Sequence, residues 1–336
     1  MSHHLIIGAG PVGSATARLL LGRGDDVTLV TRSGSGLGPA GGSSPVPGST
    51  GVDASGAADV ATGTGTLTVR AADASDARLM ADLAQGAAAI HNCANPAYHR
   101  WATDWPPIAA SLLGAAERSG AVLTTVSNLY GYGPVDGELH EDLPLAAPGA
   151  KGRTRAQMWE RALAAHQAGR ARVTEVRGSD YLCAGPGSHM GDRVTPFVLR
   201  GKNVSVLKSA DMPHTWTSVD DVARLLLAVA ADERAWGRPW HVPSNEPRTQ
   251  REVVADLCAA AGVDPVTVRE HAPVLMRALG LVNPLIREFH EVAYQFERPF
   301  VMDSTAAQSA FGLTPTPWPD ALAGLVAAYR RPALVS

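Results

Sequence analysis

Two short stretches of the sequence combine side chains that can hold a substrate oxygen and move a proton. "TTVSNLYGYG" (124–133) is typical of the end of a buried strand, with Thr125 or Ser127 as the hydroxyl and Tyr130 just beyond it. "KGRTR" (151–155) opens a helical stretch in which Lys151 and Arg155 are four residues apart, one turn along one face. A hydroxyl that orients an oxygen, beside a group that exchanges its proton, is an arrangement for general acid–base chemistry.

Further polar and aromatic side chains are candidates for binding the substrate. Asn128 follows the strand and can bond a substrate carbonyl. "NPAYHRWATDWPP" (95–107) is interpreted as a loop in which Tyr98 and Trp101 either line a pocket for a flat or apolar substrate or pack on their neighbours. His189 and Arg298 are weaker candidates, the latter for an anionic group. No His, Cys or Asp cluster has metal-ligand spacing, so no metal is expected.

The first residues indicate the element that must hold a cofactor. "HHLIIGAG" predicts a buried parallel strand, and Gly8, Gly10 and Gly13 follow in G-x-G-x-x-G spacing at the opening of a helix. Gly8 permits the turn, Gly10 leaves room for a pyrophosphate, and Gly13 lets the helix approach the strand. Pro11 and Val12 lie where the N-terminus of the helix offers N–H groups to a phosphate. This context predicts a dinucleotide site.

The end of the next strand bears on which dinucleotide binds. "DDVTLVTR" ends in Thr31, Arg32 and Ser33, without the carboxylate that usually bonds the ribose of NAD. Arg32 and Ser33 could instead bind a 2′-phosphate, so NADP is favoured and NAD is the second choice. Residues 34–66, nearly all Gly, Ser, Ala, Pro, Thr and Val, are predicted to be a flexible insertion.

Composition excludes several classes of protein. The chain has 336 residues, 45% hydrophobic, and a net charge of −3. No apolar run approaches the roughly 20 residues of a membrane span, and the N-terminus lacks the features of a secretory signal. Three cysteines without paired spacing favour a reduced, cytoplasmic protein. Since there is no basic stripe, we expect neither nucleic acid nor membrane as a partner. The sequence allows a homodimer without requiring one.

Six motifs occur along nearly the whole chain in an order that resembles the extended short-chain dehydrogenase/reductase family, also called the NAD-dependent epimerase/dehydratase family. They are "GAGPVGSA", "AADASD", "IHNCAN", "VRGSDYLCAGPG", "HTWTSVDDVARLLL" and "FVMDSTAAQSAFGLTPTPWPDAL". The resemblance adds cofactor contacts by Asp73 and Ala74 near the adenine and by Cys93, Ala94 and Asn95 near the ribose.

The alternating strands and helices, together with the resemblance, predict a doubly wound α/β Rossmann fold with a parallel sheet and a smaller C-terminal lobe. We expect residues 1–185 to form the dinucleotide-binding domain, with 213–245 returning to it. Residues 186–212 and 246–336 would form the substrate-binding lobe. The site would lie in the cleft between them.

The chain departs from the family at the catalytic pair. The family places a Tyr and a Lys where this chain has Lys151 and Arg155. The resemblance implies that Arg155 keeps a positive charge near the ribose. Three accounts remain open: another acid, Lys151 or Tyr130, moves the proton; the chemistry is non-redox, such as that of a dehydratase or cyclase, or water supplies the proton; or the protein is a non-catalytic NADP-binding sensor. The predicted function is NAD(P)-dependent oxidation, reduction or epimerisation of a small molecule, a secondary metabolite or a sugar derivative.

Overall fold

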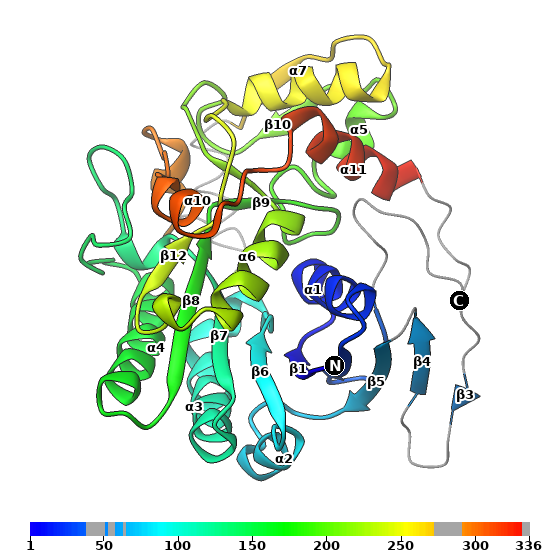
Figure 1. Cartoon of the computed structure of the whole chain (residues 1–336). Coiled ribbons are helices and arrows are strands. Elements are labelled where there is room, and N and C mark those ends of the chain that lie inside the picture. The colour runs from blue at the N-terminus through cyan, green and yellow to red at the C-terminus, as the bar shows by residue number, and fades with distance from the viewer. Residues whose placement is uncertain (38–50, 53–57, 63–64, 272–290, 331–336) are drawn as a thin grey trace.

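The computed structural model describes residues 1–37, 51–52, 58–62, 65–271 and 291–330. Within these residues, one large sheet forms the centre of the molecule (Figure 1). Its strand order is β12 (Pro239–His241), β8 (Arg172–Gly178), β7 (Val122–Asn128), β6 (Ala87–Asn92), β1 (His3–Ile7), β2 (Asp26–Thr31), β5 (Gly65–Ala71), β4 (Ala58–Thr62) and β3 (Gly51–Val52). From β12 to β5 all neighbours are parallel. This confirms the predicted Rossmann α/β fold.

Helices cover both faces of the sheet because alternate strand residues point to opposite sides. Ile6 of β1 packs with α1 (Pro11–Gly22) and α6 (Val219–Ala231). Leu5 and Ile7, its neighbours, pack on the other face. That face is covered by α2 (Ala77–Leu83), α3 (Trp101–Ser119) and α4 (Ala150–Gln167). The candidate site lies at the carboxyl ends of the strands between these two helical layers.

The predicted insertion at 34–66 contains strands that its composition does not predict. β4 pairs antiparallel with β5, and β3 pairs antiparallel with β4, so both extend the sheet beyond its parallel part. Residues 38–50, 53–57 and 63–64 of the insertion lie outside the described residues. A segment made almost entirely of small residues can join the sheet because the backbone hydrogen bonds between strands do not depend on side-chain type.

A second core forms the C-terminal lobe. It begins where β8 ends, with β9 (Asp180–Leu182) paired to β11 (Trp216–Ser218), and β10 (Val204–Val206) paired to β13 (Val268–Glu270). Three helices pack on it (Figure 1): α5 (Thr195–Val198), α7 (Gln250–Ala261) and α11 (Trp318–Arg330). Helix α10 (Thr305–Phe311) packs beside β12. Strand β12 and helix α6 lie with the large sheet, so 213–245 joins both cores.

Segment 95–107 is helical rather than the expected loop. A single 3₁₀ turn, η1 (Tyr98–Arg100), leads into α3, which includes Pro106 and Pro107. Each proline removes one helical hydrogen bond. Trp105 is fully buried within this first part of the helix, and its packing offsets that loss.

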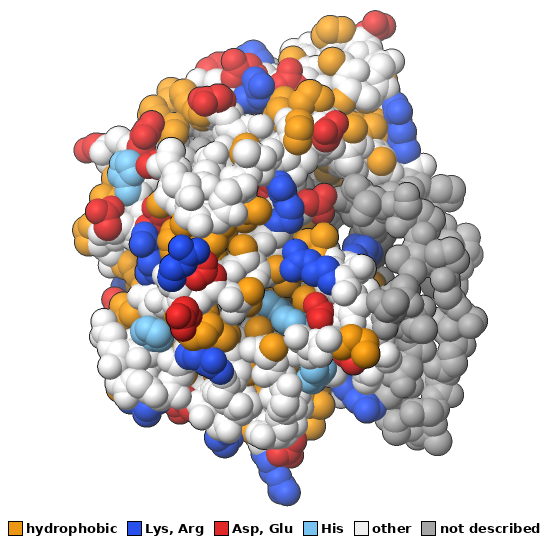
Figure 2. Space-filling view, viewed as in Figure 1, with side chains coloured by type: hydrophobic (Ala, Val, Ile, Leu, Met, Phe, Trp, Pro, Cys, Tyr) orange, Lys and Arg blue, Asp and Glu red, His pale blue; other side chains and the backbone are white. Residues whose placement is uncertain are grey.

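The described helices include none that is both long and apolar enough to cross a bilayer. On the face seen in Figure 2, Lys and Arg side chains are interspersed with Asp and Glu, in keeping with the small net charge.

Candidate functional site

The glycine turn between β1 and α1 combines a tight backbone with one open position. Gly8 has a φ of +98°, and a Cβ there would lie 2.8 Å from the Cys93 carbonyl oxygen. A Cβ at Gly13 would lie 1.9 Å from the Gly8 oxygen. A Cβ at Gly10, by contrast, would meet nothing within 4 Å. Gly8 and Gly13 are therefore required by the fold, whereas Gly10 keeps a space clear above the turn.

The end of α1 that faces this space is suited to a phosphate. Gly10 is the N-cap and supplies no side-chain cap, and Pro11 is the first helical residue. The positive end of the helix dipole thus meets the cleared space. Val12 is buried under the turn. These residues fit the pyrophosphate of a dinucleotide.

The residues expected near the adenosine lie around the end of β2. Arg32 and Ser33 are exposed, and Thr31 is half-buried at the end of the strand. Hydrogen bonds from the Ser75 amide and hydroxyl lower the pKa of Asp73, and nearby Arg32 adds to the effect. Arg32 therefore lies close enough to Asp73 to lower its pKa, and the two residues follow the ends of the neighbouring strands β2 and β5. No carboxylate stands at the end of β2 itself.

The residues after β6 adjoin the glycine turn. The Cys93 amide donates to the Ile7 carbonyl oxygen at 2.9 Å, and burial raises the pKa of its thiol to about 12. Cys93 contributes backbone rather than a reactive thiol. Ala94 is half-buried and Asn95 exposed, while Ala74 is buried near the end of β5.

Lys151 is buried at the start of α4. Its side chain is 4% exposed, and its Nζ lies 3.8 Å from Glu291 Oε2. The ammonium also stands 4.5 Å from the centre of the Tyr98 ring. A carboxylate and an aromatic face both stabilise a positive charge. Burial with these partners gives a cation that is shielded from bulk water yet balanced.

Arg155, one turn along α4, is held by tryptophans. Its guanidinium lies 4.6 Å from the Trp101 ring and 4.3 Å from the Trp105 ring, and its Nη1 donates to the Val126 carbonyl oxygen at 3.3 Å. Burial lowers its pKa, while the buried Glu175 acts in the opposite direction. The described contacts of Arg155 are thus with α3 and β7, and the ribose contact stays a prediction.

The structure distinguishes the two candidate hydroxyls of β7. Ser127, at the end of the strand, is 2% exposed, and its Oγ has no hydrogen-bond partner within the described residues. Its carbonyl oxygen accepts from the Tyr181 hydroxyl at 2.6 Å. Thr125 lies nearer the start of β7 and lines a cavity of about 200 Å³ between α3, α4 and the sheet. A buried hydroxyl with an unused hydrogen bond suits a ligand, so Ser127 is the better candidate.

Tyr130 lies in the 3₁₀ turn η2 (Tyr130–Tyr132) directly after β7. Burial raises the pKa of its phenol to about 12, and the nearby Asp180 charge adds to this, although hydrogen bonds from Tyr98 and Gln295 oppose it. The phenol therefore keeps its proton at neutral pH. The ring also packs 6.0 Å from that of Trp101. Its environment opposes the ionised form that a proton acceptor needs.

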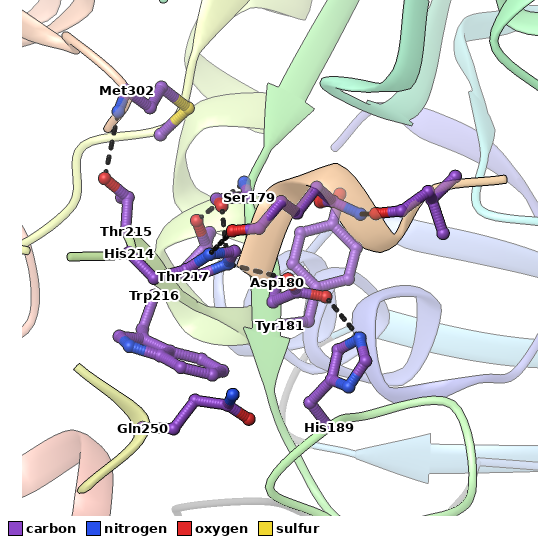
Figure 3. A network of polar contacts seen from close by, with 12 residues as sticks. Ser179, Asp180, Tyr181, His189, His214, Thr215, Trp216, Thr217, Gln250 and Met302 are labelled. Carbon is purple, nitrogen blue, oxygen red and sulfur yellow. Dashed lines mark hydrogen bonds and ion pairs between the residues drawn. The ribbon is translucent and has the colours of Figure 1, made fainter. Parts of the chain in front are cut away.

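A buried carboxylate, Asp180, acts on the pKa of both Tyr98 and Tyr130, and no sequence motif indicates this role. His214 Nε2 lies 2.7 Å from Asp180 Oδ2, and His189 Nε2 lies 3.5 Å from Oδ1 (Figure 3). Burial acts to raise the pKa of Asp180, but His189, His214 and Arg193 outweigh it and lower the pKa. Burial also lowers the pKa of His189 to about 4. Asp180 is thus an ionised group in the wall of the site.

Two other predicted site residues, Asn128 and Arg298, make hydrogen bonds or ion pairs within the protein. The Asn128 side chain accepts from the Tyr130 amide at 3.1 Å, which shapes the turn after β7. Arg298 is half-exposed and pairs with Asp136 at 3.0 Å. Neither contact involves Lys151. The structure thus brings together Lys151, Tyr98 and Tyr130 with Asp180 and Glu291, two acids that could be found only once the fold was known, because they come from distant segments.

The model of the NAD dependent epimerase/dehydratase family matches residues 4–242. No curated protein sequence matches the chain.

Several solved structures resemble the whole chain, each across 98% of its length. DesIV, a dTDP-glucose 4,6-dehydratase from Streptomyces venezuelae solved with NAD, matches at 20% identity over 97% of its chain, with a TM-score of 0.72. UDP-glucose 4-epimerase from Thermotoga maritima, solved with UDP-glucose, matches at 16% identity over 98%, with a TM-score of 0.72. WbmH from Bordetella bronchiseptica, in complex with NAD⁺, matches at 18% identity over 99%, with a TM-score of 0.67. At these identities the likeness establishes the fold.

Proposed function

The chain belongs to the NAD-dependent epimerase/dehydratase family, and we propose that it is an NADP-dependent oxidoreductase or epimerase in which Lys151 moves the substrate's proton. The observation that carries the proposal is the buried ammonium of Lys151, balanced by Glu291 and the Tyr98 ring on the helix that follows β7. A bound nicotinamide dinucleotide would supply or take up hydride at a substrate carbon. The chain's own residues must then bind the cofactor, orient the substrate oxygen and exchange its proton.

Cofactor binding is assigned to the glycine turn and the end of β2. The cleared space at Gly10 and the uncapped start of α1 accept the pyrophosphate. Arg32 and Ser33, both exposed, would hold a 2′-phosphate through charge-assisted hydrogen bonds from the guanidinium and the hydroxyl. Because no carboxylate stands there to repel it, NADP is preferred. NAD, which two of the similar structures contain, is the second choice.

The proton chemistry is assigned to Ser127 and Lys151. The unused hydrogen bond of Ser127 Oγ orients the substrate oxygen. Lys151 gives a proton to this oxygen in reduction and takes one back in oxidation. Tyr130 is the weaker candidate, because burial and Asp180 raise its pKa to about 12, which makes ionisation costly. Arg155 supports the site through the tryptophans and, as the sequence predicts, through a positive charge near the ribose.

The substrate is proposed to be a small molecule with a carbonyl or hydroxyl group, a secondary metabolite or a sugar derivative. Asn128, Tyr98, Trp101 and His189 are the proposed contacts, with Arg298 a more distant candidate for an anionic group. The supporting feature is the mixed aromatic and polar wall around Lys151. We further propose a cytoplasmic location, which the free cysteines support.

A non-catalytic NADP-binding sensor is the second candidate, and non-redox chemistry on the same fold is the third. The observation that favours the sensor is the replacement of the family's Tyr and Lys by Lys151 and Arg155, together with the raised pKa of Tyr130. Such a protein would bind the cofactor without turning it over.

The experiment that separates these functions measures NADPH binding by fluorescence, then NADPH consumption with a panel of ketones, aldehydes and nucleotide sugars. The proposal expects binding and consumption with at least one carbonyl compound. Tight binding with no consumption across the panel would favour the sensor. Conversion of a substrate with no net NADPH consumption would indicate epimerisation or non-redox chemistry, which isotope exchange at the reacting carbon distinguishes.

A further inference from the structure

Helix α4 begins without a capping side chain of its own. Its N-cap, Gly149, supplies no side-chain hydrogen bond. Glu291, which comes from the C-terminal lobe 140 residues further along the chain, occupies that place instead. Its Oε1 accepts from the Lys151 amide at 2.5 Å, and its Oε2 lies 3.8 Å from Lys151 Nζ. One carboxylate therefore contacts both the backbone and the side chain of the same residue.

The fit of Glu291 depends on the absence of a side chain at Gly149. A Cβ at Gly149 would lie 2.3 Å from Glu291 Oε1, 2.4 Å from its Cγ and 2.6 Å from its Cδ. Real Cβ atoms do not approach so closely, so any other residue would displace the carboxylate. Gly149 has an ordinary negative φ of −86°, so its backbone does not require glycine. A Cβ there would instead move the Glu291 carboxylate, which is the end of a flexible side chain, out of its place at the helix N-terminus.

The placement of this carboxylate is favourable for two reasons. A negative charge at a helix N-terminus is stabilised by the helix dipole. The Glu291 side chain is 23% exposed and that of Lys151 is 4% exposed, so water screens the pair less than it screens a surface pair. The carboxylate therefore attracts the ammonium of the lysine and restrains its position.

We propose that Glu291 is a positioning residue that caps helix α4 and holds the ammonium of Lys151 in the place from which it delivers a proton. This inference rests on the proposed function only for its link to turnover. Its physical content, the coupling of the two charges, does not depend on it.

Other titratable and charged groups also face this region and remain constant in the test. The Tyr98 ring lies under the ammonium. The charged and titratable groups that act electrostatically on Tyr98 or on its neighbours are Tyr130, Tyr294, Asp180, Arg193 and Arg155. Glu291 differs from these groups because it contacts Lys151 through both of its oxygens.

The test uses the small number of lysines in the chain. Lys151, Lys202 and Lys208 are its three lysines. In protein labelled with ¹³C at the lysine Cε, the signal of Lys151 can therefore be followed by NMR, with Lys151→Met identifying it. Glu291→Gln removes the charge but keeps an oxygen that can accept from the amide. Gly149→Ala displaces the carboxylate without changing it. Glu297→Gln is the matched control, because Glu297 pairs with Lys208 at 2.6 Å elsewhere in the lobe.

We expect Glu291→Gln and Gly149→Ala to change the chemical shift of the Lys151 Cε signal and to broaden it, because the ammonium is no longer held in one place. Glu297→Gln should leave that signal unchanged. In both variants kcat should fall by roughly tenfold to a hundredfold, with the affinity for NADPH unaltered. A Lys151 signal like that of the wild type in both variants would overturn the inference. Loss of the proposed proton role would show separately, as wild-type turnover in Lys151→Met despite a changed Lys151 signal in Glu291→Gln.

Discussion

Two glycines in the same turn should respond to the same substitution in opposite ways. Alanine at Gly13 would place a Cβ 1.9 Å from the Gly8 oxygen, so the backbone must separate by about 1.1 Å to reach the closest contact that proteins show. Overpacking of this kind costs about 1–3 kcal/mol. Alanine at Gly10 meets nothing within 4 Å, and its φ of −65° suits alanine. Gly10→Ala should therefore change the free energy of unfolding by less than about 1 kcal/mol.

The affinity for the cofactor, unlike the stability of the fold, should be lowered by Gly10→Ala. Because Gly10 lies where the backbone approaches the pyrophosphate, a methyl group there should weaken NADPH binding by about tenfold or more, or about 1.4 kcal/mol. Thermal unfolding with and without NADPH measures both effects, since ligand binding to the folded state raises the melting temperature. Gly13→Ala should melt several degrees below the wild type without cofactor. Gly10→Ala should melt like the wild type alone but gain less from NADPH. An equal gain in Gly10→Ala would refute the placement of the pyrophosphate.

Three further expectations concern the cofactor, the second proton candidate and acid stability. Arg32→Ala should weaken NADPH binding by about tenfold and leave NADH binding unchanged; an unaltered preference would contradict the assignment of NADP. Tyr130→Phe should lower kcat by less than about tenfold, because its pKa near 12 disfavours proton exchange, and a loss of several hundredfold would make Tyr130 the acid. Burial lowers the pKa of His91, His189 and His241 from 6.5 to about 3, 4 and 3. The unfolded chain therefore binds protons that the folded chain excludes below pH 6.5. Stability should be full above pH 6.5 and fall by about 1 kcal/mol per histidine per pH unit below it; equal urea midpoints at pH 7 and pH 5 would contradict this.

The cofactor half of the molecule could be predicted because its determinants are local. Gly8, Gly10 and Gly13 follow one another within six residues, between a strand and a helix that their own periodicity indicates. The parallel sheet follows from the repetition of such units. Each of these signals needs only neighbouring residues.

The substrate side could not be predicted in the same way. Glu291 reaches Lys151 across 140 residues, and Asp180 at the start of β9 meets His214 just before β11, and neither pairing has a sequence spacing that reveals it. The segment around Trp105 is rich in aromatic residues and prolines, which favours a loop, whereas the structure places Trp105 in α3, where its side chain is fully buried. Likewise, β4 has a composition without strand preference and is held by backbone pairing to β5.

The position of Arg155 on its helix follows from local sequence, whereas the neighbours of its side chain do not. Its spacing from Lys151 predicts a shared helix face, and both side chains are buried on α4. The guanidinium, however, packs between two tryptophans of α3 that lie 50 or more residues earlier in the sequence. The charge that the sequence indicates is therefore present, but its immediate neighbours depend on tertiary packing.

The most direct test of the central claim is the turnover of Lys151→Met with the best carbonyl substrate of the panel. NADPH affinity and the circular dichroism spectrum serve as controls for an intact fold and cofactor site. If Lys151 moves the proton, kcat should fall by about a hundredfold to ten-thousandfold while NADPH binds as in the wild type. A kcat within about threefold of the wild type, when this role should be worth at least a hundredfold, would contradict the account.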